Sequence, residues 1–179
     1  MDAFLEARAD GKTRFLGFTG HCSPATHLYF LNRLEALGIE FDACQMPLNV
    51  CDPSFQSFQH DVLPVLLSRT YGVIAMKTMA GGSLMGGRID TTPGDIRTRD
   101  IPDVVSRTDL THATLHQYVY SLPVSTLCSG CRSTHELEEN VNVLKNFKQL
   151  PETDLKKLVQ YAAPYAGLVV ENYKRVLNH

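Results

Sequence analysis

Four short apolar runs in this chain each end in small and polar residues, and a helix-compatible stretch follows each of them. The runs are RFLGFTGH (14–21), FDACQMPLNV (41–50), YGVIAMKTMAGG (71–82) and PVSTLCSGCR (123–132). Strands that alternate with helical patterns predict a parallel sheet, because parallel strands need a long crossover that a helix usually makes. A closed (β/α)8 barrel needs eight such units and carries its functional residues where the strands end. Four units therefore predict half a barrel.

Residues that typically begin or end helices mark the limits of the first two helices. Residues 2–10 carry apolar positions at helical spacing, and Gly11 follows as a stop signal, so they predict the last turns of a helix. After the first run, Ser23 precedes Pro24 as a helix cap, and the helix is expected to end at Gly38. Its buried face is predicted from four leucines, Leu28, Leu31, Leu34 and Leu37.

Further helices follow the second, third and fourth runs. Pro64 predicts a break between a short helical turn and a second helix. Helical patterns also occupy residues 109–122, residues 133–147 and the tail from residue 151. The long loop of residues 78–108 is rich in Gly, Arg, Asp and Thr, and its length predicts a functional lid or a mobile segment.

Composition and charge narrow the class of protein. The 179 residues are 44% hydrophobic, which allows one sizeable core, so residues 1–179 are expected to form a single domain. The net charge of −2, with both signs interspersed, argues against nucleic acid or a membrane surface as partner. No apolar stretch approaches the ~20 residues that span a bilayer, and no signal peptide opens the chain. As written, the sequence predicts a cytoplasmic protein, and an export signal could only lie upstream of Met1.

The five cysteines favour reduced, buried thiols over a disulfide framework, because they are odd in number and lie mostly in apolar segments. Cys128 and Cys131 form a C-x-x-C motif. Zinc needs four ligands, and the other cysteines, Cys22, Cys44 and Cys51, are too dispersed to supply a second pair. A thioredoxin-like motif would open a helix after a first strand, whereas this one overlaps the last run. Coincidence is favoured over a metal or redox role.

Several segments, in the right order, resemble the second half of the aldo/keto reductases. They are GKTRFLGFTGH, FDACQMPLNVCD, VLPVL, GVIAMKTMAGG and SLPVSTLCSG followed by LEENV, and they cover nearly the whole chain. The resemblance extends to a bacterial branch with GFTGH-like, QMPLN and MK-x-M-x-G-G sequences at strands five to seven. It implies an α/β fold: the C-terminal half of a (β/α)8 TIM barrel, with strands five to eight as four parallel βα units plus C-terminal helices.

Members of this family transfer hydride between NADPH and a carbonyl substrate. A tyrosine acid, supported by a lysine and an aspartate, protonates the oxygen, and a histidine orients the substrate. Those four residues lie on or after the first four strands, which are missing from this chain, so no catalytic residue is assigned. Because the chain also begins inside a helix, we expect a truncated NADP-dependent oxidoreductase domain that binds NADPH weakly and is inactive when isolated.

The resemblance places Thr19, Gly20 and His21 where the family hydrogen-bonds the nicotinamide carboxamide, since polar groups at a strand end can fix the orientation of an amide. Gly20 stands where many members have Asn, so one contact is lost. His21 either replaces that contact or makes only a local bond in its loop. Gln45 matches a glutamine that binds the same amide, with a structural bond to a neighbouring strand as the alternative. Asn49 is interpreted as a turn residue.

The third cluster consists of Met76, Lys77, Thr78, Met79, Gly81 and Gly82. Met76 takes the position of an aromatic residue that stacks on the nicotinamide in many relatives, and it can cover that face by apolar contact. Lys77 can neutralise a pyrophosphate, and the glycines let the backbone approach phosphates closely. A solvated loop lysine is the alternative for Lys77.

The fourth cluster matches the adenosine-phosphate site of the family, with Ser129, Gly130, Arg132, Glu139 and Asn140. Anions favour helix N-termini, because free N–H groups and the helix dipole attract negative charge. Arg132 can bind a 2′-phosphate and favour NADP over NAD.

Other charged residues of this region have plainer interpretations. Glu136 stands where many relatives carry a helical arginine, which argues against a preference for NADP. Solvated helix charges are the alternative for Glu138 and Glu139. The histidines on helical patterns, His112, His116 and His135, are interpreted as surface or core-edge residues.

The sequence leaves three functional hypotheses open. The first is the cofactor-binding half of an aldo/keto reductase, whose intact form acts on a small-molecule carbonyl or alcohol. The second is a half-barrel that self-associates or pairs with another subunit through its open edges, without catalysis. The third is a C-x-x-C metal or redox protein.

Overall fold

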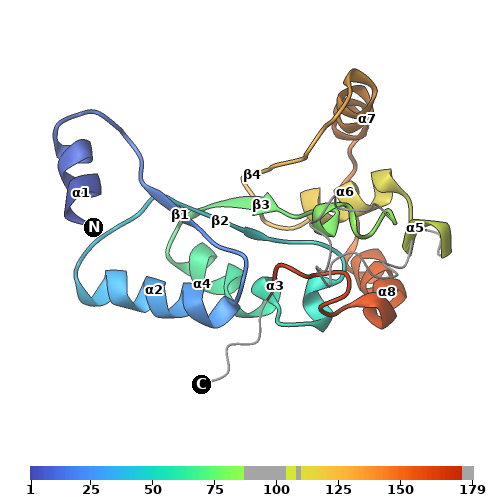
Figure 1. Cartoon of the computed structure of the whole chain (residues 1–179), viewed down its shortest axis with the longest axis horizontal. Coiled ribbons are helices and arrows are strands. Elements are labelled where there is room, and N and C mark those ends of the chain that lie inside the picture. The colour runs from blue at the N-terminus through green and yellow to red at the C-terminus, as the bar shows by residue number, and fades with distance from the viewer. Residues whose placement is uncertain (87–103, 108–109, 175–179) are drawn as a thin grey trace, which may run out of the picture.

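Four parallel strands form one sheet in the order β1-β2-β3-β4 (Figure 1). The computed structural model describes residues 1–86, 104–107 and 110–174. The strands are β1 (Gly17–Thr19), β2 (Ala43–Pro47), β3 (Gly72–Met76) and β4 (Thr126–Leu127). Each lies within one of the four apolar runs, and each pairs in parallel with the next strand along the chain. The prediction of four parallel βα units is confirmed.

Helices connect and follow the strands. They are α1 (Asp2–Ala9), α2 (Pro24–Ala36), α3 (Phe58–Asp61), α4 (Leu63–Ser68), α5 (Val104–Arg107), α6 (His112–Tyr120), α7 (Thr134–Lys145) and α8 (Glu152–Ala162). All except α5, which lies in the predicted loop of residues 78–108, occur where the sequence predicts helical segments. Short 3-10 turns occur at η1 (Asp52–Ser54), η2 (Ala80–Gly82) and η4 (Ala163–Tyr165). The break near Pro64 is confirmed, because α3 ends and α4 begins around Val62, with Pro64 in the first turn of α4.

The two faces of the sheet differ in burial. Residues that point to one face, such as Cys44, Met46 and Val73, are almost completely buried, and Figure 1 shows α2 and α4 along one side of the sheet. The alternate residues of each strand are half-buried or exposed, except Pro47 at the end of β2, which is buried. In a complete barrel these alternate residues would point to the interior, which layers of side chains fill. One face therefore forms the core and the other is only partly covered.

The second helix departs from its predicted face in two details. Leu31 and Leu34 are buried, but Leu37 lies beyond the end of α2 and is 50% exposed, so its assignment to the buried face is wrong. His27 is buried instead, because it is one turn before Leu31 and packs edge-on against Phe58. Ser23 is the N-cap residue, as predicted, but its side chain makes no capping hydrogen bond.

The long loop and the thiols also differ from expectation. The described parts of the predicted loop, residues 78–86 and 104–107, contain η2 and α5. Residues 87–103 and 108 lie outside the described residues, so the lid or mobile segment stays a prediction. No disulfide joins the five cysteines, and their reduced state stays a prediction. Cys44 and Cys51 are buried, but Cys128 and Cys131 are exposed, so burial is wrong for the C-x-x-C pair. The exposure follows from their position in an irregular loop after β4.

Two helices, α1 and α7, contribute no residue to the core. Figure 1 shows α1 at one end of the sheet and α7 standing beside β4 at the other. The exposed apolar side chains of α7 are Leu137, Val141 and Leu144, a spacing that places them on one side of the helix. Both ends of the half-barrel thus carry helix surface that no described residue buries. Among the described residues, no helix is long and apolar enough to cross a membrane.

Candidate cofactor site

The predicted site residues of the four strands share one edge of the sheet. Because the strands are parallel, their C-terminal ends lie on the same side, and Thr19 pairs directly with Gln45 in the register of β1 and β2. Pro47 pairs with Met76 at the ends of β2 and β3. Thr19, Gln45 and Met76 all belong to the partly covered face. Their side chains are therefore available to a ligand at this edge.

Gly20 and His21 follow β1. A Cβ atom at Gly20 would lie 2.7 Å from Cε1 of His27, so the packing of His27 under this turn demands glycine. His21 is exposed, its Nδ1 lies 3.7 Å from Sγ of Cys22, and its ring packs edge-on against Tyr173 at 6.0 Å between centroids. The structure thus gives His21 a local contact, and a contact with a ligand at this position stays a prediction.

Gln45 connects the second strand to the loop after the fourth. Its Nε2 donates to Sγ of Cys128 at 3.2 Å, a contact between residues 83 positions apart. This is a structural bond, but it passes β3 and reaches the loop after β4, whereas the alternative from the sequence was a bond to a neighbouring strand. A bond to a thiol is weak, and Gln45 remains half-buried on the open face. The predicted amide contact is compatible with this geometry.

Lys77 adopts an unusual backbone conformation directly after β3. Its φ of 56° lies in the left-handed region, which non-glycine residues rarely enter. Nδ2 of Asn49 donates to the Lys77 carbonyl at 3.3 Å, and the Lys77 ammonium lies 5.6 Å from the centre of the Tyr173 ring. Lys77 forms no ion pair with any residue that the structure describes. Its side chain is half-buried, which disfavours the interpretation as a freely solvated lysine.

The turn after Lys77 combines a buried hydroxyl with an exposed glycine. Thr78 is 3% exposed, and its Oγ1 lies 3.4 Å from Nε2 of His116. Met79 is half-buried against the core, and Gly81 is exposed with a φ of 70°. The backbone at Gly81 is therefore accessible, as a phosphate contact requires.

The fourth cluster forms a chain of polar contacts that reaches His116, the residue that also contacts Thr78. Nδ2 of Asn140 donates to Oγ of Ser129 at 3.1 Å and to Sγ of Cys131 at 3.0 Å. Oγ of Ser129 lies 3.3 Å from Nε2 of His116. His116 is 1% exposed, so its interpretation as a surface or core-edge residue is wrong. Burial, with a smaller contribution from the neighbouring His112, lowers the pKa of His116 to about 4, so the ring is neutral near pH 7.

The N-terminus of α7 is occupied by its own side chains. Oγ of Ser133 accepts from the backbone N–H of Glu136 at 3.2 Å, and a Glu136 carboxylate oxygen accepts from the N–H of Arg132 at 2.6 Å. A phosphate at this helix end would compete with that carboxylate. Arg132 and Gly130 are exposed, and Glu139 lies 3.7 Å from His135 on the helix surface. The alternative for Glu139, a solvated helix charge, fits this contact.

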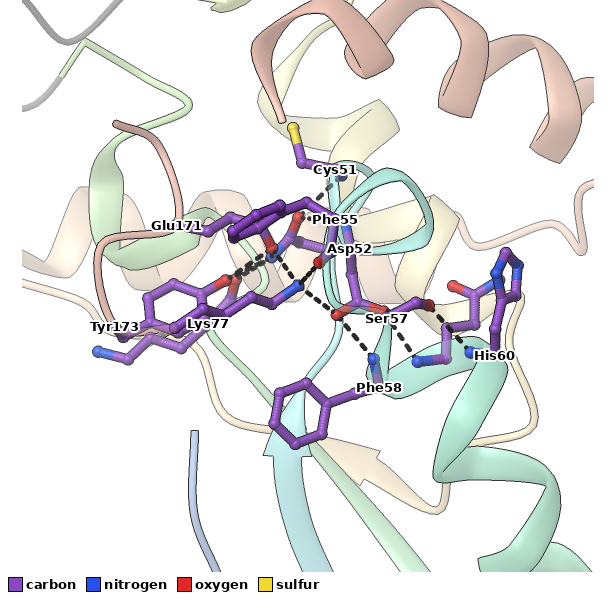
Figure 2. A network of polar contacts seen from close by, with 12 residues as sticks. Cys51, Asp52, Phe55, Ser57, Phe58, His60, Lys77, Glu171 and Tyr173 are labelled. Atoms are coloured by element: carbon purple, nitrogen blue, oxygen red, sulfur yellow. Dashed lines mark hydrogen bonds and ion pairs between the residues drawn. The ribbon is translucent and has the colours of Figure 1, made fainter. Parts of the chain in front are cut away.

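The most extensive polar network at this edge involves residues that sequence reasoning did not assign to a site. It joins Asn49 and Asp52, which follow β2, to Glu171, Tyr173 and Lys174 near the C-terminus (Figure 2). We call these five residues the buried ion network. Four of them are 0% exposed and Tyr173 is 7% exposed.

Lys174 is at the centre of the network. Its Nζ lies 2.7 Å from Oδ1 of Asp52 and 2.8 Å from Oε1 of Glu171, and it donates to the carbonyl of Phe55 at 2.6 Å. Burial raises the pKa of Asp52 and of Glu171, and in both cases the ammonium of Lys174 acts in the opposite direction. Two buried carboxyls face one buried ammonium, so loss of Lys174 would leave both carboxyls without their only contacting cation among the described residues.

Asn49 connects the network to β2, to Lys77 and to the C-terminal residues. Its Oδ1 accepts from the backbone N–H groups of Cys51 and Asp52, which is the turn role that the sequence indicates. Its Nδ2 donates to the hydroxyl of Tyr173 at 2.8 Å in addition to the Lys77 carbonyl. Sequence spacing alone predicts only the turn; the polar residues of the tail sequence ENYK were the available signal for the rest.

Neither a metal site nor a pocket elsewhere is favoured as the functional site. Within the described ranges, no group of three or more His, Cys, Asp or Glu side chains could hold a metal ion. A cavity of about 690 Å³ lies at the opposite, N-terminal end of the strands. Its arginines are already paired, Arg8 with Asp42 at 3.6 Å and Arg69 with Glu35 at 2.8 Å. The strand-end edge therefore carries the better candidate site.

Structural comparison identifies the class of fold as part of an aldo-keto reductase barrel. The chain matches the aldo-keto reductase AKR11C1 from Bacillus halodurans in its holo form, with a TM-score of 0.64 and 20% identity over 92% of this chain. The apo form of that protein gives a TM-score of 0.62 at 18% identity. The glycerol dehydrogenase AKR11B4 from Gluconobacter oxydans gives a TM-score of 0.63 at 21% identity over 89% of this chain.

These similarities cover only part of the solved proteins. The chain spans 55% of AKR11C1 in the holo form, 56% in the apo form and 52% of AKR11B4. No model of a protein family matches the sequence, and no curated protein matches it. The comparison thus confirms the α/β half-barrel fold that the sequence predicts.

Proposed function

We propose that this chain is the cofactor-binding half of an NADPH-dependent aldo/keto reductase, which in its intact form transfers hydride between NADPH and a small carbonyl or alcohol. The observation that carries the proposal is the row of predicted residues along one edge of the sheet, from Thr19 and Gln45 through Lys77 to Asn140. The similarity to solved aldo-keto reductases supports the same fold.

The residues present fit a dinucleotide at several points. Nδ1 of His116 and Oδ1 of Asn140 are buried polar atoms without a partner among the described residues, so the adenosine end offers unused hydrogen-bonding capacity. Lys77 offers an unpaired ammonium, as far as the described residues go, for a diphosphate. Thr19 and Gln45 face the open side of the sheet and would orient the carboxamide. When bound, the cofactor would supply the hydride.

Catalysis is assigned to residues outside this chain. The acid, its supporting residues and the substrate-orienting histidine belong to the first half of the barrel, so the isolated chain is expected to bind cofactor weakly without turnover. The Glu136 carboxylate at the start of α7 opposes a 2′-phosphate there, so the preference between NADP and NAD is set by the balance of Arg132 against Glu136.

A titration of NADPH, followed by its fluorescence, tests the proposal. The chain is titrated alone and together with a separately produced first half of an aldo-keto reductase barrel. We expect weak saturable binding alone, and turnover of a test aldehyde only in the mixture. Lys77→Met should weaken binding, while Lys148→Met, an exposed lysine between α7 and α8, should leave it unchanged. Absence of binding in both arrangements would reject the cofactor assignments.

A second candidate function rests on the open ends of the half-barrel. Among the described residues, β1 and β4 each pair with another strand on one side only, and α1 and α7 have no buried residue. Edge strands and exposed apolar surface promote association. We propose that these ends bind a second half-barrel, either another copy of this chain or a different subunit. Sedimentation velocity should then show concentration-dependent association, and a monodisperse monomer at all concentrations would exclude self-pairing.

A further inference from the structure

Residues 170–174, which we call the C-terminal strap, cover the strand ends beside the predicted cofactor residues. Val170, Glu171 and Lys174 of the strap are 0% exposed. The ion contact of Lys174 with Asp52 fastens the strap to the turn that follows β2, and the contact of Lys174 with Glu171 lies within the strap. Figure 2 shows Glu171 and Tyr173 beside Asp52. The strap is therefore an integral part of this edge of the fold.

The hydroxyl of Tyr173 fixes the orientation of its ring. It accepts from Nδ2 of Asn49 at 2.8 Å and donates to Oε1 of Glu171 at 3.3 Å. The ring then faces the two strand ends nearest to it. One ring surface carries the Lys77 ammonium at 5.6 Å, and His21 packs against the ring at 6.0 Å. A single strap residue thus contacts two predicted cofactor residues that are 56 positions apart in the chain.

Asn49 couples the ring to the backbone of Lys77. The same Nδ2 atom that binds the Tyr173 hydroxyl also donates to the Lys77 carbonyl at 3.3 Å. Lys77 is therefore constrained twice, through its strained backbone and through its ammonium on the ring. A lysine in a loop ordinarily samples many rotamers, and immobilising it costs side-chain entropy. Here part of that cost is met in the fold, before any ligand binds.

We propose that Tyr173 is a positioning residue for Lys77: its ring holds the ammonium at the strand ends, where it binds the diphosphate of a dinucleotide. The inference rests on the proposed function for the identity of the ligand. The proposal adds Tyr173 to the cofactor site. Tyr173 contacts Lys77 and is not itself assigned a contact with the cofactor.

Paired variants separate the ring from the hydroxyl. Tyr173→Phe keeps the ring, whereas Tyr173→Leu removes both groups. The free energy of a cation–π contact at an accessible site corresponds to about a two- to fivefold change in affinity. We expect Tyr173→Leu to weaken NADPH binding by this factor relative to Tyr173→Phe. In a Lys77→Met background, the same two substitutions should give equal affinities, because the ring then has no ammonium to position.

A measurement on Lys77 itself tests whether its side chain lies on the Tyr173 ring, and it does not depend on cofactor binding. Lysines are dimethylated with ¹³C-formaldehyde, and the Lys77 signal is assigned by its loss in Lys77→Met. The ring should shift this signal upfield of that of exposed Lys148 in the wild-type chain, which tests the contact even if Tyr173→Leu does not fold. The shift should persist in Tyr173→Phe and disappear in Tyr173→Leu.

The results distinguish a positioning role of Tyr173 from a purely structural role of the strap. An unshifted Lys77 signal in the wild-type chain would overturn the positioning role, whatever the NADPH titration gives. An equal loss of NADPH affinity on removal of the ring with and without Lys77 would show that the strap is only structural. If NADPH does not bind but the signal is shifted, the proposed function fails, and inorganic pyrophosphate is added. Movement of the Lys77 signal then supports a positioned anion site, and no movement overturns it.

Discussion

The buried ion network and the cluster around α7 lie at the two ends of the predicted cofactor track and differ in how they are held. The network is enclosed and joined by ion contacts of 2.7 and 2.8 Å. The α7 cluster, which consists of Cys131, Ser129, Asn140 and His116, rests on contacts of 3.0 to 3.3 Å, and α7 buries no residue. Resemblance to a family identified the exposed end, whereas only the structure revealed the enclosed one.

The two ends also differ in their partners and in their burial. The network is enclosed and joined by charge contacts, and within it, as far as the described residues go, one buried atom, Oε2 of Glu171, lacks a hydrogen-bond partner. The α7 cluster has two buried polar atoms without partners and an apolar helix face that no described residue covers. We infer that the α7 end is the part of this fold that depends most on a ligand or on another half-barrel.

Lys174→Met tests the contrast between the buried ion network and the α7 cluster, and it is expected to have the largest effect on stability. The substitution leaves Asp52 and Glu171 facing each other in a buried site, and breaking a buried pair in this way costs about 3 to 5 kcal/mol. We expect the free energy of unfolding, measured with urea, to fall by that amount. Lys156→Met removes an exposed pair with Glu152 and should change stability by less than ~1 kcal/mol. Equal small losses in the two variants would show that the network is not essential.

A pH series tests the buried histidine of the α7 cluster. The pKa of His116 is about 4 in the folded chain against an ordinary value of 6.5, so the unfolded chain binds more protons between these values. Stability should therefore rise with pH across that window and be lost as the pH falls through it, by roughly 3 kcal/mol in total.

The variant His116→Gln isolates this contribution. The raised pKa values of Asp52 and Glu171 act in the opposite direction, because the folded chain then holds more protons, but they are common to both proteins and cancel in the difference. His135→Gln, on the exposed side of α7, is the matched control. A wild-type pH curve that His116→Gln leaves unchanged would contradict the buried, neutral histidine.

Removal of the α7 cap should have a smaller effect. Ser133→Ala loses the side-chain acceptor of the Glu136 N–H, which typically costs about 1 kcal/mol. Ser23→Ala is the control, because Ser23 occupies the same position at α2 without a capping bond. Circular dichroism during urea denaturation should show the larger loss for Ser133→Ala. The reverse order would mean that α7 is not held at its N-terminus as described.

The smallest change is expected on the apolar face of α7. Leu144 is 54% exposed, so Leu144→Ser should alter the free energy of unfolding by no more than ~0.5 kcal/mol. Leu115→Ser, at a position 1% exposed on α6, should cost several times as much. If the half-barrels associate through α7, sedimentation will show that Leu144→Ser weakens association. A large loss of stability for Leu144→Ser would mean that α7 is packed in the monomer.

Local patterns predicted the elements well because their causes are local. Apolar runs, Pro64 and Gly38 act within a few residues, and strands, helix breaks and helix ends occur where they indicate. Errors appear where a long-range neighbour decides. His27 is buried because Phe58, which lies on a different helix, packs against it. Leu37 is an error with a local cause, since α2 ends one residue before it. Gly20 is required by His27, which no spacing rule could predict.

The sequence by itself determined the number of strands, their parallel order and the residues at their ends, because hydrophobic period and turn residues act through adjacent positions. Only the tertiary structure decided that Asn49, Asp52 and Lys174 form one network, since the partners are 122 positions apart and meet through chain folding. It likewise decided that Tyr173 lies against Lys77. Burial removes water as an alternative partner, so polar side chains that are unremarkable in sequence become mutually dependent once enclosed.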